Sequence, residues 1–294
     1  MTTDFTVTLL GTSSPAPSID RFGMSTLVEA GDERLLFDCG RGAIQRLLQL
    51  GPEHPRVDKL FLTHLHSDHI VGIPDLWLTA WIMGRRTAFK VWGPEGTTDM
   101  MAHLEKAYEA DIHIRRDLDE LLPQSGIDIE SHDIAEGFEY TLGDVRVVVF
   151  DVDHRPVTPA FGYRIEYNGK VVVLSGDTRP CENLVKYAQG ADLLVHEIIA
   201  PQAFLKRATQ MTEHHRQAVI EHHTTPQQAG EIFSRINPKL AVYSHVIGGP
   251  IPGYVEEILD GTASTYSGAV EVGNDLTRIE VGDKVKSFRI EDQP

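Results

Sequence analysis

Cysteine, positive charge and long apolar runs are all scarce in this sequence. Its 294 residues include two cysteines, Cys39 and Cys181, which cannot build a disulfide framework and are typical of a reducing compartment. Nowhere do about eighteen apolar residues follow one another, and the first residues show neither the basic opening nor the apolar run of a signal peptide. We therefore expect a cytoplasmic protein with no membrane partner, in which both cysteines are small buried residues.

The shortage of positive charge limits the choice of partners. Lysine and arginine total 27 against 43 aspartate and glutamate residues, and the formal net charge is −16. A surface this acidic repels polyanions, so nucleic acid is not favoured as the main partner. A Gly-x-Ser-x-Gly elbow and a glycine-rich phosphate loop are also absent. No serine or cysteine nucleophile is indicated, and any hydrolysis is expected to be direct.

Histidine is the residue that stands out, with 14 copies, and its densest cluster lies at 63–69. There His64, His66, Asp68 and His69 follow an apolar segment, 59–62, that predicts a short buried strand. On an extended or tightly looped backbone His64 and His66 point the same way, and the next two ligands can turn toward a second point. The cluster predicts two adjacent metal ions, and donors without thiolate favour zinc over iron or manganese. A solvated loop is the alternative, and the flanking strand and helix patterns weigh against it.

Apolar periodicity divides the chain into two runs of strands and helices. The first run has strands expected at 5–10, 25–30, 34–38, 59–63 and 89–92, with helices at 43–50, 73–83 and 97–108. The second has strands at 144–152, 160–167, 170–174, 192–196 and 240–244, a helix at 181–188 and a helix-rich region up to residue 237. Both runs begin with strands and continue with strand–helix alternation. This order predicts a duplicated α/β fold of four layers, αββα, with two sheets between helices. We expect residues 1–294 to form a single domain.

Two segments of the first run invite a functional interpretation. The segment 111–123 is a charged connector in which a substrate-facing lid could lie. Trp77 and Trp81 share one face of the helix at 73–83, and we expect them in the core or at a dimer contact. His103, His113 and His132 have no ligand-type neighbours in sequence, so each is expected to be a solvated surface residue.

Four further ligand-type residues stand at the ends of expected strands: His154, Asp177, His196 and His245. Strand-end loops on a rigid scaffold are where α/β proteins assemble sites from distant parts of the sequence. Alone, each of these residues would be better explained as a hydrogen-bonded structural residue. Together with the cluster at 63–69, a joint metal site is the simpler explanation.

Several short motifs resemble those of the metallo-β-lactamase superfamily of binuclear zinc hydrolases, and within it the ribonuclease Z and arylsulfatase branch. They are Phe37-Asp38-Cys39-Gly40, the cluster at 63–69, His154, Ser175-Gly176-Asp177-Thr178-Arg179, Val195-His196-Glu197, His223-Thr224-Thr225 and Ser244-His245. The cluster is specific for the superfamily, whereas Glu197 with His223 points to the branch. The resemblance covers nearly the whole chain. It implies the metallo-β-lactamase fold, a four-layer αββα sandwich, and a metal-dependent hydrolase that acts on ester bonds.

The resemblance also implies which residues hold the metal ions. One zinc ion would be held by three histidines, His64, His66 and His154. The second would be held by Asp68, His69 and His245. Asp177 would bridge the two ions.

Around these ligands the resemblance implies supporting and catalytic roles. Asp38 would accept a hydrogen bond from a ligand imidazole, and His196 would be structural or support a ligand from behind. Asp68 would also accept a proton from the attacking water. Glu197 would orient His223 as the acid that protonates the leaving group. His214, His215 and His222 remain unassigned.

The expected substrate follows from what the chain lacks relative to bacterial ribonuclease Z. The bacterial enzymes carry a long tRNA-gripping arm between the third histidine and the bridging aspartate. Here His154 and Asp177 are 23 positions apart, which leaves room for one hairpin. Together with the net charge of −16, this favours a small anionic ester, namely an aryl sulfate or a phosphodiester such as a cyclic nucleotide.

Other functions remain open. Ribonuclease Z-type tRNA 3′ processing is the alternative, because every catalytic residue is present and four arginines could form a basic patch: Arg85, Arg86, Arg115 and Arg116. A lactone, thioester or β-lactam hydrolase would use the same metals on a carbonyl. A flavin-linked iron oxidoreductase would be expected to carry Glu in place of His66, and a binding protein without catalysis would be expected to lose ligands. The helix with Trp77 and Trp81 could also form the face of a homodimer.

Overall fold

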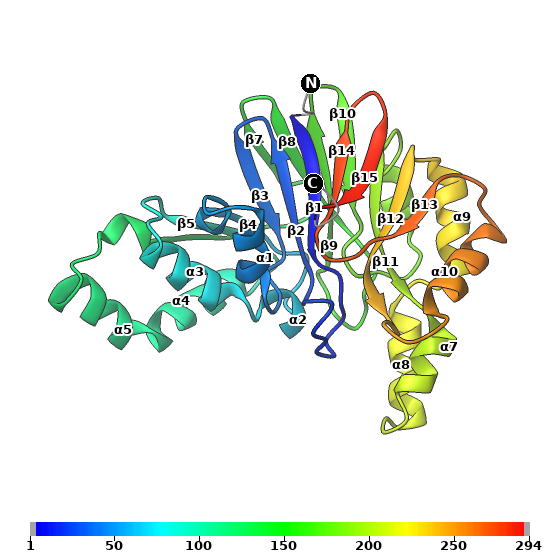
Figure 1. Cartoon of the computed structure of the whole chain (residues 1–294), viewed down its shortest axis with the longest axis horizontal. Coiled ribbons are helices and arrows are strands. Elements are labelled where there is room, and N and C mark those ends of the chain that lie inside the picture. Colours follow the sequence, from blue (N-terminus) through cyan, green and yellow to red (C-terminus); the bar gives the residue numbers. More distant parts are fainter. Residues whose placement is uncertain (1–3, 291–294) are drawn as a thin grey trace.

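Two β-sheets pack face to face at the centre of the molecule (Figure 1). The structure is a computed structural model and describes residues 4–290. In the order in which they lie side by side, the strands of the eight-stranded sheet are β15 (Val285–Arg289), β14 (Thr277–Val281), β1 (Phe5–Gly11), β2 (Ser25–Ala30), β3 (Glu33–Phe37), β4 (Lys59–Phe61), β5 (Phe89–Gly93) and β6 (Ile129–Asp133). Those of the seven-stranded sheet are β13 (Val270–Val272), β12 (Leu240–Ile247), β11 (Leu193–Ile199), β10 (Lys170–Leu174), β9 (Phe161–Tyr167), β8 (Val145–Asp151) and β7 (Glu139–Leu142).

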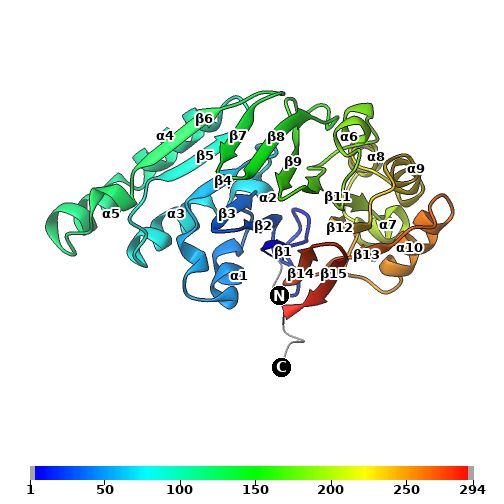
Figure 2. The same cartoon turned by 90° about the horizontal axis from the view of Figure 1, so that it is seen from above.

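Helices cover the outer face of each sheet (Figure 2). The first sheet shares an apolar core with α1 (Ala43–Leu50), α3 (Ile73–Ile82) and α4 (Thr97–Ala107), and the second with α6 (Glu182–Tyr187), α9 (Pro226–Ile236) and α10 (Tyr254–Ala263). The remaining helices are α2 (Ser67–Ile70), α5 (Glu109–His113) with the π-helical turn Ile114–Leu118, α7 (Pro201–Arg207) and α8 (Glu213–His222). The four-layer αββα fold class is therefore confirmed. No helix within residues 4–290 has both the length and the apolar character that a membrane span requires.

The core between the sheets holds the strand that carries the histidine cluster. Phe37 and Phe61 stack with ring centroids 5.2 Å apart, and Tyr163 of β9 meets Phe37 edge-on at 5.0 Å. The hydroxyl of Tyr163 donates a hydrogen bond to the carbonyl of Leu62, 2.5 Å away. Because Leu62 lies two residues before His64, this bond joins the second sheet directly to the strand end that leads into the metal motif.

The segment 111–123 is helical over its first part, so the expectation of a charged connector is wrong there. It begins within α5 and continues as the π-helical turn. Side-chain contacts four residues apart stabilise this conformation: Arg115 lies 3.0 Å from Asp111, and His113 lies 2.8 Å from Asp117. The charged residues that suggested an irregular connector are thus the ones that hold the helix.

The two runs of strands and helices are not duplicate halves, because the C-terminal segment returns to the first sheet. β14 pairs antiparallel with β1, and β15 pairs with β14, so this sheet is built from both ends of the chain. The sequence pattern also misses β6, an edge strand whose side chains are half-buried or exposed and give no apolar signal.

Trp77 and Trp81 lie in the core of the first sheet and not at a surface. Both are fully buried, and their indole N–H groups donate to the carbonyls of Ile127 and Pro123, 3.0 and 2.9 Å away. These two rings cannot form a homodimer face, since neither reaches the outside of the monomer, and a homodimer as such stays a prediction.

The four arginines proposed as a basic patch do not form one. Arg85 is buried and donates to two backbone carbonyls, and burial lowers its pKa to about 10. Arg86 donates to backbone carbonyls as well. Arg115 and Arg116 each contact a neighbouring carboxylate. Arg85 is thus buried and Arg115 and Arg116 are neutralised, so Arg86 alone of the four is an exposed cation without an ion pair among the described residues.

Candidate metal centre

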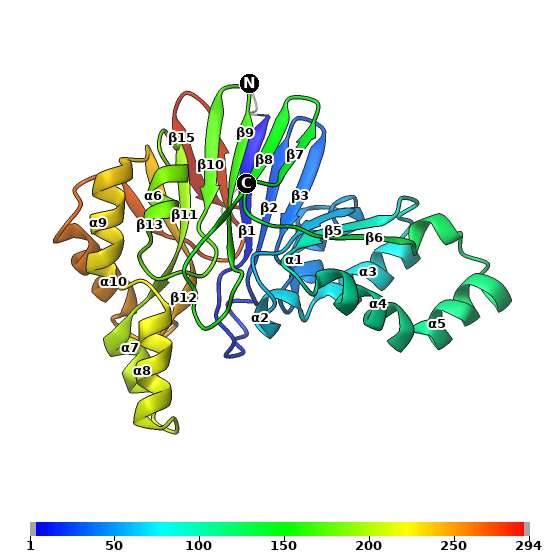
Figure 3. The ribbon, with the colours of Figure 1, turned by 180° about the vertical axis from the view of Figure 1, so that it is seen from behind.

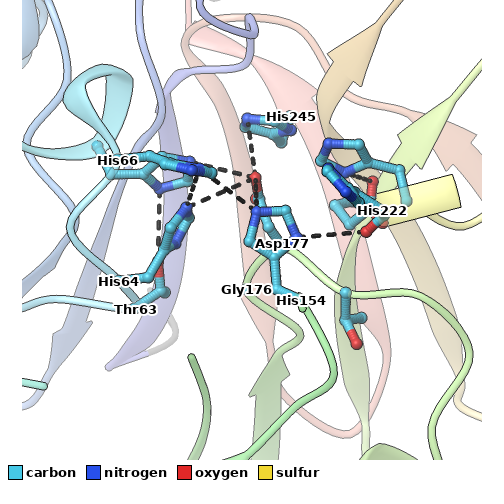
Figure 4. Close-up of polar contacts among 12 residues, drawn as sticks. Thr63, His64, His66, His154, Gly176, Asp177, His222 and His245 are labelled. Atoms are coloured by element: carbon cyan, nitrogen blue, oxygen red, sulfur yellow. Dashed lines mark hydrogen bonds and ion pairs between the residues drawn. The ribbon is translucent and has the colours of Figure 1, made fainter. Parts of the chain in front are cut away.

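Strand ends from both sheets bring the expected metal ligands together at one edge of the sheets. They come from the loop after β4 (His64, His66), from α2 (Asp68, His69), from the segments after β8 and β10 (His154, Asp177) and from β12 (His245). In Figure 4 the side chains of His64, His66, His154 and His245 converge on Asp177. Each was selected from the sequence, and the fold places all seven in one cluster.

Two backbone positions at this edge take conformations that L-residues rarely adopt. Gly176, directly before Asp177, has φ +61°, and a Cβ there would lie 2.2 Å from the carbonyl oxygen of Phe161. Only glycine fits, so Gly176 lets the chain turn Asp177 into the cluster. His245 has φ +47° without being glycine. Such strain is typical of residues that the surrounding structure holds in place for function.

Three histidines form the first group of donors. The Nε2 atom of His64 lies 2.9 Å from Nδ1 of His66, and Nε2 of His154 lies 3.4 Å from the same Nδ1 atom. These separations resemble the distance of roughly 3.3 Å that tetrahedral geometry imposes between two nitrogens bound to one zinc ion.

The second group faces the first across Asp177. The Nε2 atom of His245 lies 3.2 Å from Oδ2 of Asp68, and Nε2 of His69 lies 3.7 Å from the same oxygen. Asp177 Oδ2 is 3.4 Å from Nε2 of both His69 and His245. It is also 3.9 Å from Nε2 of His64 and 4.0 Å from Nε2 of His154. One carboxylate oxygen is thus within reach of both groups.

Asp38 supports the second group from behind. Its Oδ2 atom lies 2.7 Å from Nδ1 of His69 and accepts a hydrogen bond from the hydroxyl of Thr63, 2.8 Å away. The backbone N–H of Thr63 donates to the other carboxylate oxygen, also at 2.8 Å. This arrangement favours a proton on Nδ1 of His69 and turns its Nε2 atom toward Asp177, where a bound metal ion would take the place of a proton.

Burial and the neighbouring charged groups shift the pKa values of the ligands in the cluster. Burial lowers the pKa of His64 well below its ordinary value, and burial lowers the pKa of His154 to about 4, so both imidazoles are neutral near pH 7. Burial opposes protonation of His69 too, but Asp177 and other carboxylates outweigh it and hold its pKa well above the ordinary value. For Asp177, burial is outweighed by His245 and His69, and its pKa lies well below the ordinary value. The carboxylate of Asp177 therefore stays ionised although it is buried.

The donor set fits divalent metal ions. The Nε2 atom of His69 is buried and has no hydrogen-bond partner, although it points toward Asp68 and Asp177. A buried polar atom of this kind is costly unless something else satisfies it. Neutral imidazoles together with buried carboxylates are the donors that such ions take in hydrolases.

Glu197 and His223 lie next to the metal-ligand cluster. The Oε2 atom of Glu197 is 3.2 Å from Nδ1 of His223, and the backbone N–H of Thr224 donates to Oε1 at 2.8 Å. The His223 ring stacks on the ring of His245 with centroids 5.8 Å apart. Glu197 and His223, the pair expected from the sequence, thus contact each other beside one metal group. His222 meets His154 through its backbone carbonyl, 3.3 Å from Nδ1, and through an edge-on ring contact with centroids 6.0 Å apart.

His196 lies on the other face of β11 from this pair. Its ring meets Phe233 of α9 edge-on at 5.5 Å, and its Nδ1 atom is 2.5 Å from the carbonyl of Glu197. Burial lowers the pKa of His196, so the residue is neutral. Of the two roles expected for His196, the contacts favour the structural one.

A pocket of about 450 Å³ opens onto the cluster and is lined partly by residues that the sequence reading missed. His66, Asp68, Asp177 and other cluster residues form its polar side. Residues of α7, of α8 and of the turn between them form its opposite wall, among them Phe204, Arg207 and Met211. No ligand-type pattern marks this wall in the sequence. The sequence places this wall near the site only by its position, since residues 198–222 connect Glu197 to His223.

Comparison with known proteins extends these observations. Over residues 33–246 the sequence matches the family described as Beta-lactamase superfamily domain. A protein named Ribonuclease Z from Mycobacterium bovis (strain BCG / Pasteur 1173P2) is 38% identical over 280 residues, which cover 94% of this chain and 98% of that protein. The crystal structure of the metallo-beta-lactamase fold protein YhfI from Bacillus subtilis has a TM-score of 0.69 at 18% identity, with 97% of this chain and 99% of that chain covered. Human tRNase Z, short form, has a TM-score of 0.66 at 22% identity, with 94% and 99% covered.

These relatives overturn the expectations about substrate and partner. A small sulfate or phosphate ester, with nucleic acid disfavoured, conflicts with a full-length relative named Ribonuclease Z, so both expectations are wrong. The lack of a long arm does not distinguish this chain from the relative. The alignment of 280 residues covers 98% of the relative, so the relative has no long additional arm either. The net charge does not decide the partner, because salt screens charges beyond about one Debye length and a polyanion responds to the nearby cations.

The family follows from the extent of these matches. The family match covers more than half of the chain, and the relative from Mycobacterium bovis aligns with nearly all of it. The chain belongs to the metallo-β-lactamase superfamily, as a metal-dependent hydrolase homologous to ribonuclease Z.

Proposed function

We propose that this chain is a ribonuclease Z-type endonuclease that cuts the 3′ extension from precursor tRNA, with two zinc ions per chain. The observation that carries the proposal is the contact between Glu197 and His223 beside the metal-ligand cluster, 3.2 Å between their nearest side-chain atoms. A ribose oxygen is a poor leaving group and needs a proton as it departs, whereas the leaving group of an activated ester does not. Identity of 38% over 94% of the chain to a protein named Ribonuclease Z supports the same conclusion.

In this proposal the ligands divide into two groups that share one carboxylate. His64, His66 and His154 would hold one zinc ion, Asp68, His69 and His245 would hold the other, and Asp177 lies within reach of both groups of ligands. Bound divalent ions would activate a water molecule and stabilise negative charge on the phosphate. Since the ligands come from both sheets, residues 1–294 act as one catalytic domain.

The chain's own residues handle the protons. Asp68 lines the pocket and can take the proton that the attacking water loses. His223 gives a proton to the leaving oxygen, an effect worth on the order of 10² to 10⁴ in rate. Glu197 holds His223 in place, because one of its oxygens is fixed by the backbone N–H of Thr224 and the other faces His223 Nδ1.

The test is a cleavage assay on a precursor tRNA with a 3′ extension, run beside an aryl sulfate, a bis-aryl phosphate and a lactone. We expect one cut at the base of the extension, loss of cleavage after chelation, recovery with zinc, and about two zinc ions per chain by elemental analysis. Efficient turnover of the aryl sulfate or the lactone with no cleavage of the RNA would contradict the proposal.

A further inference from the structure

A hairpin of two helices, α7 and α8 (residues 201–222), stands beside the metal centre (Figures 1 and 3). We call it the α7–α8 hairpin. Its residues form one wall of the 450 Å³ pocket whose opposite side carries Asp68 and Asp177. A substrate whose phosphate lies at the metal ligands must therefore pass along this hairpin.

The pocket wall that the hairpin supplies is largely apolar. Phe204, Met211 and Val219 line it, with Phe204 anchored in a small core cluster and Met211 36% exposed. An apolar wall opposite a charged centre suits a ligand with a flat, uncharged part and a phosphate. An unpaired nucleotide has both parts, and its base is free to lie against apolar side chains in a way that a paired base is not.

The hairpin also carries cations that no carboxylate neutralises. Neither Arg207 nor Arg216 forms an ion pair within the described part of the chain. Arg207 donates from Nη1 to the carbonyl of Gly249, 2.6 Å away, which fixes the guanidinium at the pocket while its other N–H groups stay available. Such a preorganised guanidinium fits a phosphate, since little freedom is lost on binding.

This availability is unusual in a chain with a net charge of −16. Many arginines elsewhere on the surface contact carboxylates, for example Arg115 with Asp111, Arg146 with Glu139 and Arg235 with Glu182. Arg41 and Arg86 are exceptions, since neither forms an ion pair in the described part of the chain. Residues 201–222 contain three lysines and arginines against two glutamates, so this segment is locally positive. A polyanion is therefore attracted to the hairpin and repelled by most of the remaining surface.

We propose, on the basis of the function proposed above, that the α7–α8 hairpin is the RNA-binding element of this enzyme. An unpaired nucleotide next to the cut lies against Phe204, Met211 and Val219, and the neighbouring backbone phosphates contact Arg207 and Arg216. The hairpin thus does in this chain what a long arm would do, and its apolar wall favours single-stranded RNA, whose bases are free to contact it.

The test measures RNA binding with a double variant, Arg207→Ala with Arg216→Ala. Its matched control is Arg115→Ala with Arg116→Ala, which removes the same charge from residues that are already paired. The probe is a stem–loop RNA with a labelled single-stranded 3′ extension, followed by fluorescence anisotropy in a His223→Ala background that slows cleavage. We expect the hairpin variant to bind at least roughly tenfold more weakly. The slope of log K against log salt should fall by about 0.7 per lost phosphate contact, and the control should stay within twofold of its parent.

A second measurement locates the RNA directly. With 4-thiouridine as the first nucleotide of the extension, photocrosslinks should map to residues 201–222. Equal affinities of the hairpin variant and the control, or crosslinks at residues 97–118, would overturn the inference while the cleavage of precursor tRNA by wild-type protein stands. A hairpin variant that changes the oligomeric state and leaves RNA affinity intact would also overturn it and mark a contact between copies. Wild-type protein that neither binds nor cuts RNA would overturn both proposals.

Discussion

Two helical protrusions extend from this molecule, and they differ in what their charges can do. The first, which we call the acidic protrusion, comprises α4, α5 and the π-helical turn, residues 97–118, and the second is the α7–α8 hairpin (Figure 3). The acidic protrusion carries five carboxylates against three lysines and arginines, and each cation contacts a carboxylate. In the α7–α8 hairpin Arg207 and Arg216 have no such contact, and the hairpin borders the metal centre.

This difference explains why the sequence alone points to the wrong substrate. Arg115 and Arg116 attract attention because they are adjacent, yet Asp111 and Asp117 neutralise them. Net charge of the whole chain is equally uninformative, because a polyanion responds to the cations within about one Debye length, roughly 8 to 10 Å at physiological ionic strength. Pairing, which only the structure shows, decides which protrusion can meet RNA.

The largest expected effect compares His223, which directly follows the α7–α8 hairpin, with a histidine of the acidic protrusion. His223→Ala should lower the rate of RNA cleavage roughly 10²- to 10⁴-fold with the metal content unchanged, because the leaving ribose oxygen loses its proton donor. Turnover of a bis-nitrophenyl phosphate, whose leaving group needs no proton, should fall far less. His113→Ala, on the acidic protrusion and 55% exposed at its side chain, is the matched control and should cleave RNA normally.

The measurement is single-turnover cleavage of precursor tRNA beside steady-state hydrolysis of the activated diester. Equal slowing of both substrates by His223→Ala would argue for a structural role of the imidazole. Loss of zinc from that variant would do the same.

The fold was readable from the sequence where apolar residues repeat regularly. β1 and β11 are buried at every position, and both keep a recognisable apolar pattern. Apolar residues alternate with Thr6 and Thr8 in β1, and β11 is apolar except at His196 and Glu197. β6 is half-buried or exposed along its length and leaves no such trace. The return of β14 to β1 could not be read either, because pairing across most of the chain length is set by the packed core and not by local pattern.

The metal cluster was more readable than the substrate pocket for a chemical reason. His64, His66 and Asp68 are residue types with few structural uses in close succession, so their spacing alone is informative. Phe204 and Arg207 are ordinary residue types on an ordinary helix, and Met211 is an ordinary residue in the turn after it. Their significance comes from the surface that they share, which exists only once α7 and α8 pack beside the cluster.

The next prediction compares the free energy of unfolding of two variants, to test which protrusion packs into the protein core. Trp77 packs in the cluster that also includes Met101 and Ile112 of the acidic protrusion, and it is fully buried. Trp77→Ala should therefore lower the free energy of unfolding by about 3 to 5 kcal/mol. Met211→Ala on the α7–α8 hairpin should change it by less than about 0.5 kcal/mol, because Met211 is partly exposed.

Urea unfolding followed by tryptophan fluorescence and circular dichroism gives both values. The converse order, with Met211→Ala the more costly, would mean that the hairpin is a core element. The substrate-binding role inferred for its exposed face would then lose its structural basis.

The smallest expected effect separates the protrusions by pH. The guanidinium of Arg116, followed by His113, holds the pKa of Asp117 below its ordinary value. The pKa is depressed in the folded state, so the contribution of Asp117 is present above the unfolded pKa of about 3.9 and is lost as pH falls through the folded pKa. From about pH 5 to about pH 3, hydrogen exchange corrected for intrinsic rates should therefore show some loss of protection at residues 109–118.

Asp117→Asn should already show this loss at about pH 5, with little further change on acidification. Residues 213–222 carry no ion pair that acidification could break, so equal loss in both segments would mean that the pairing in the acidic protrusion does not hold its helix.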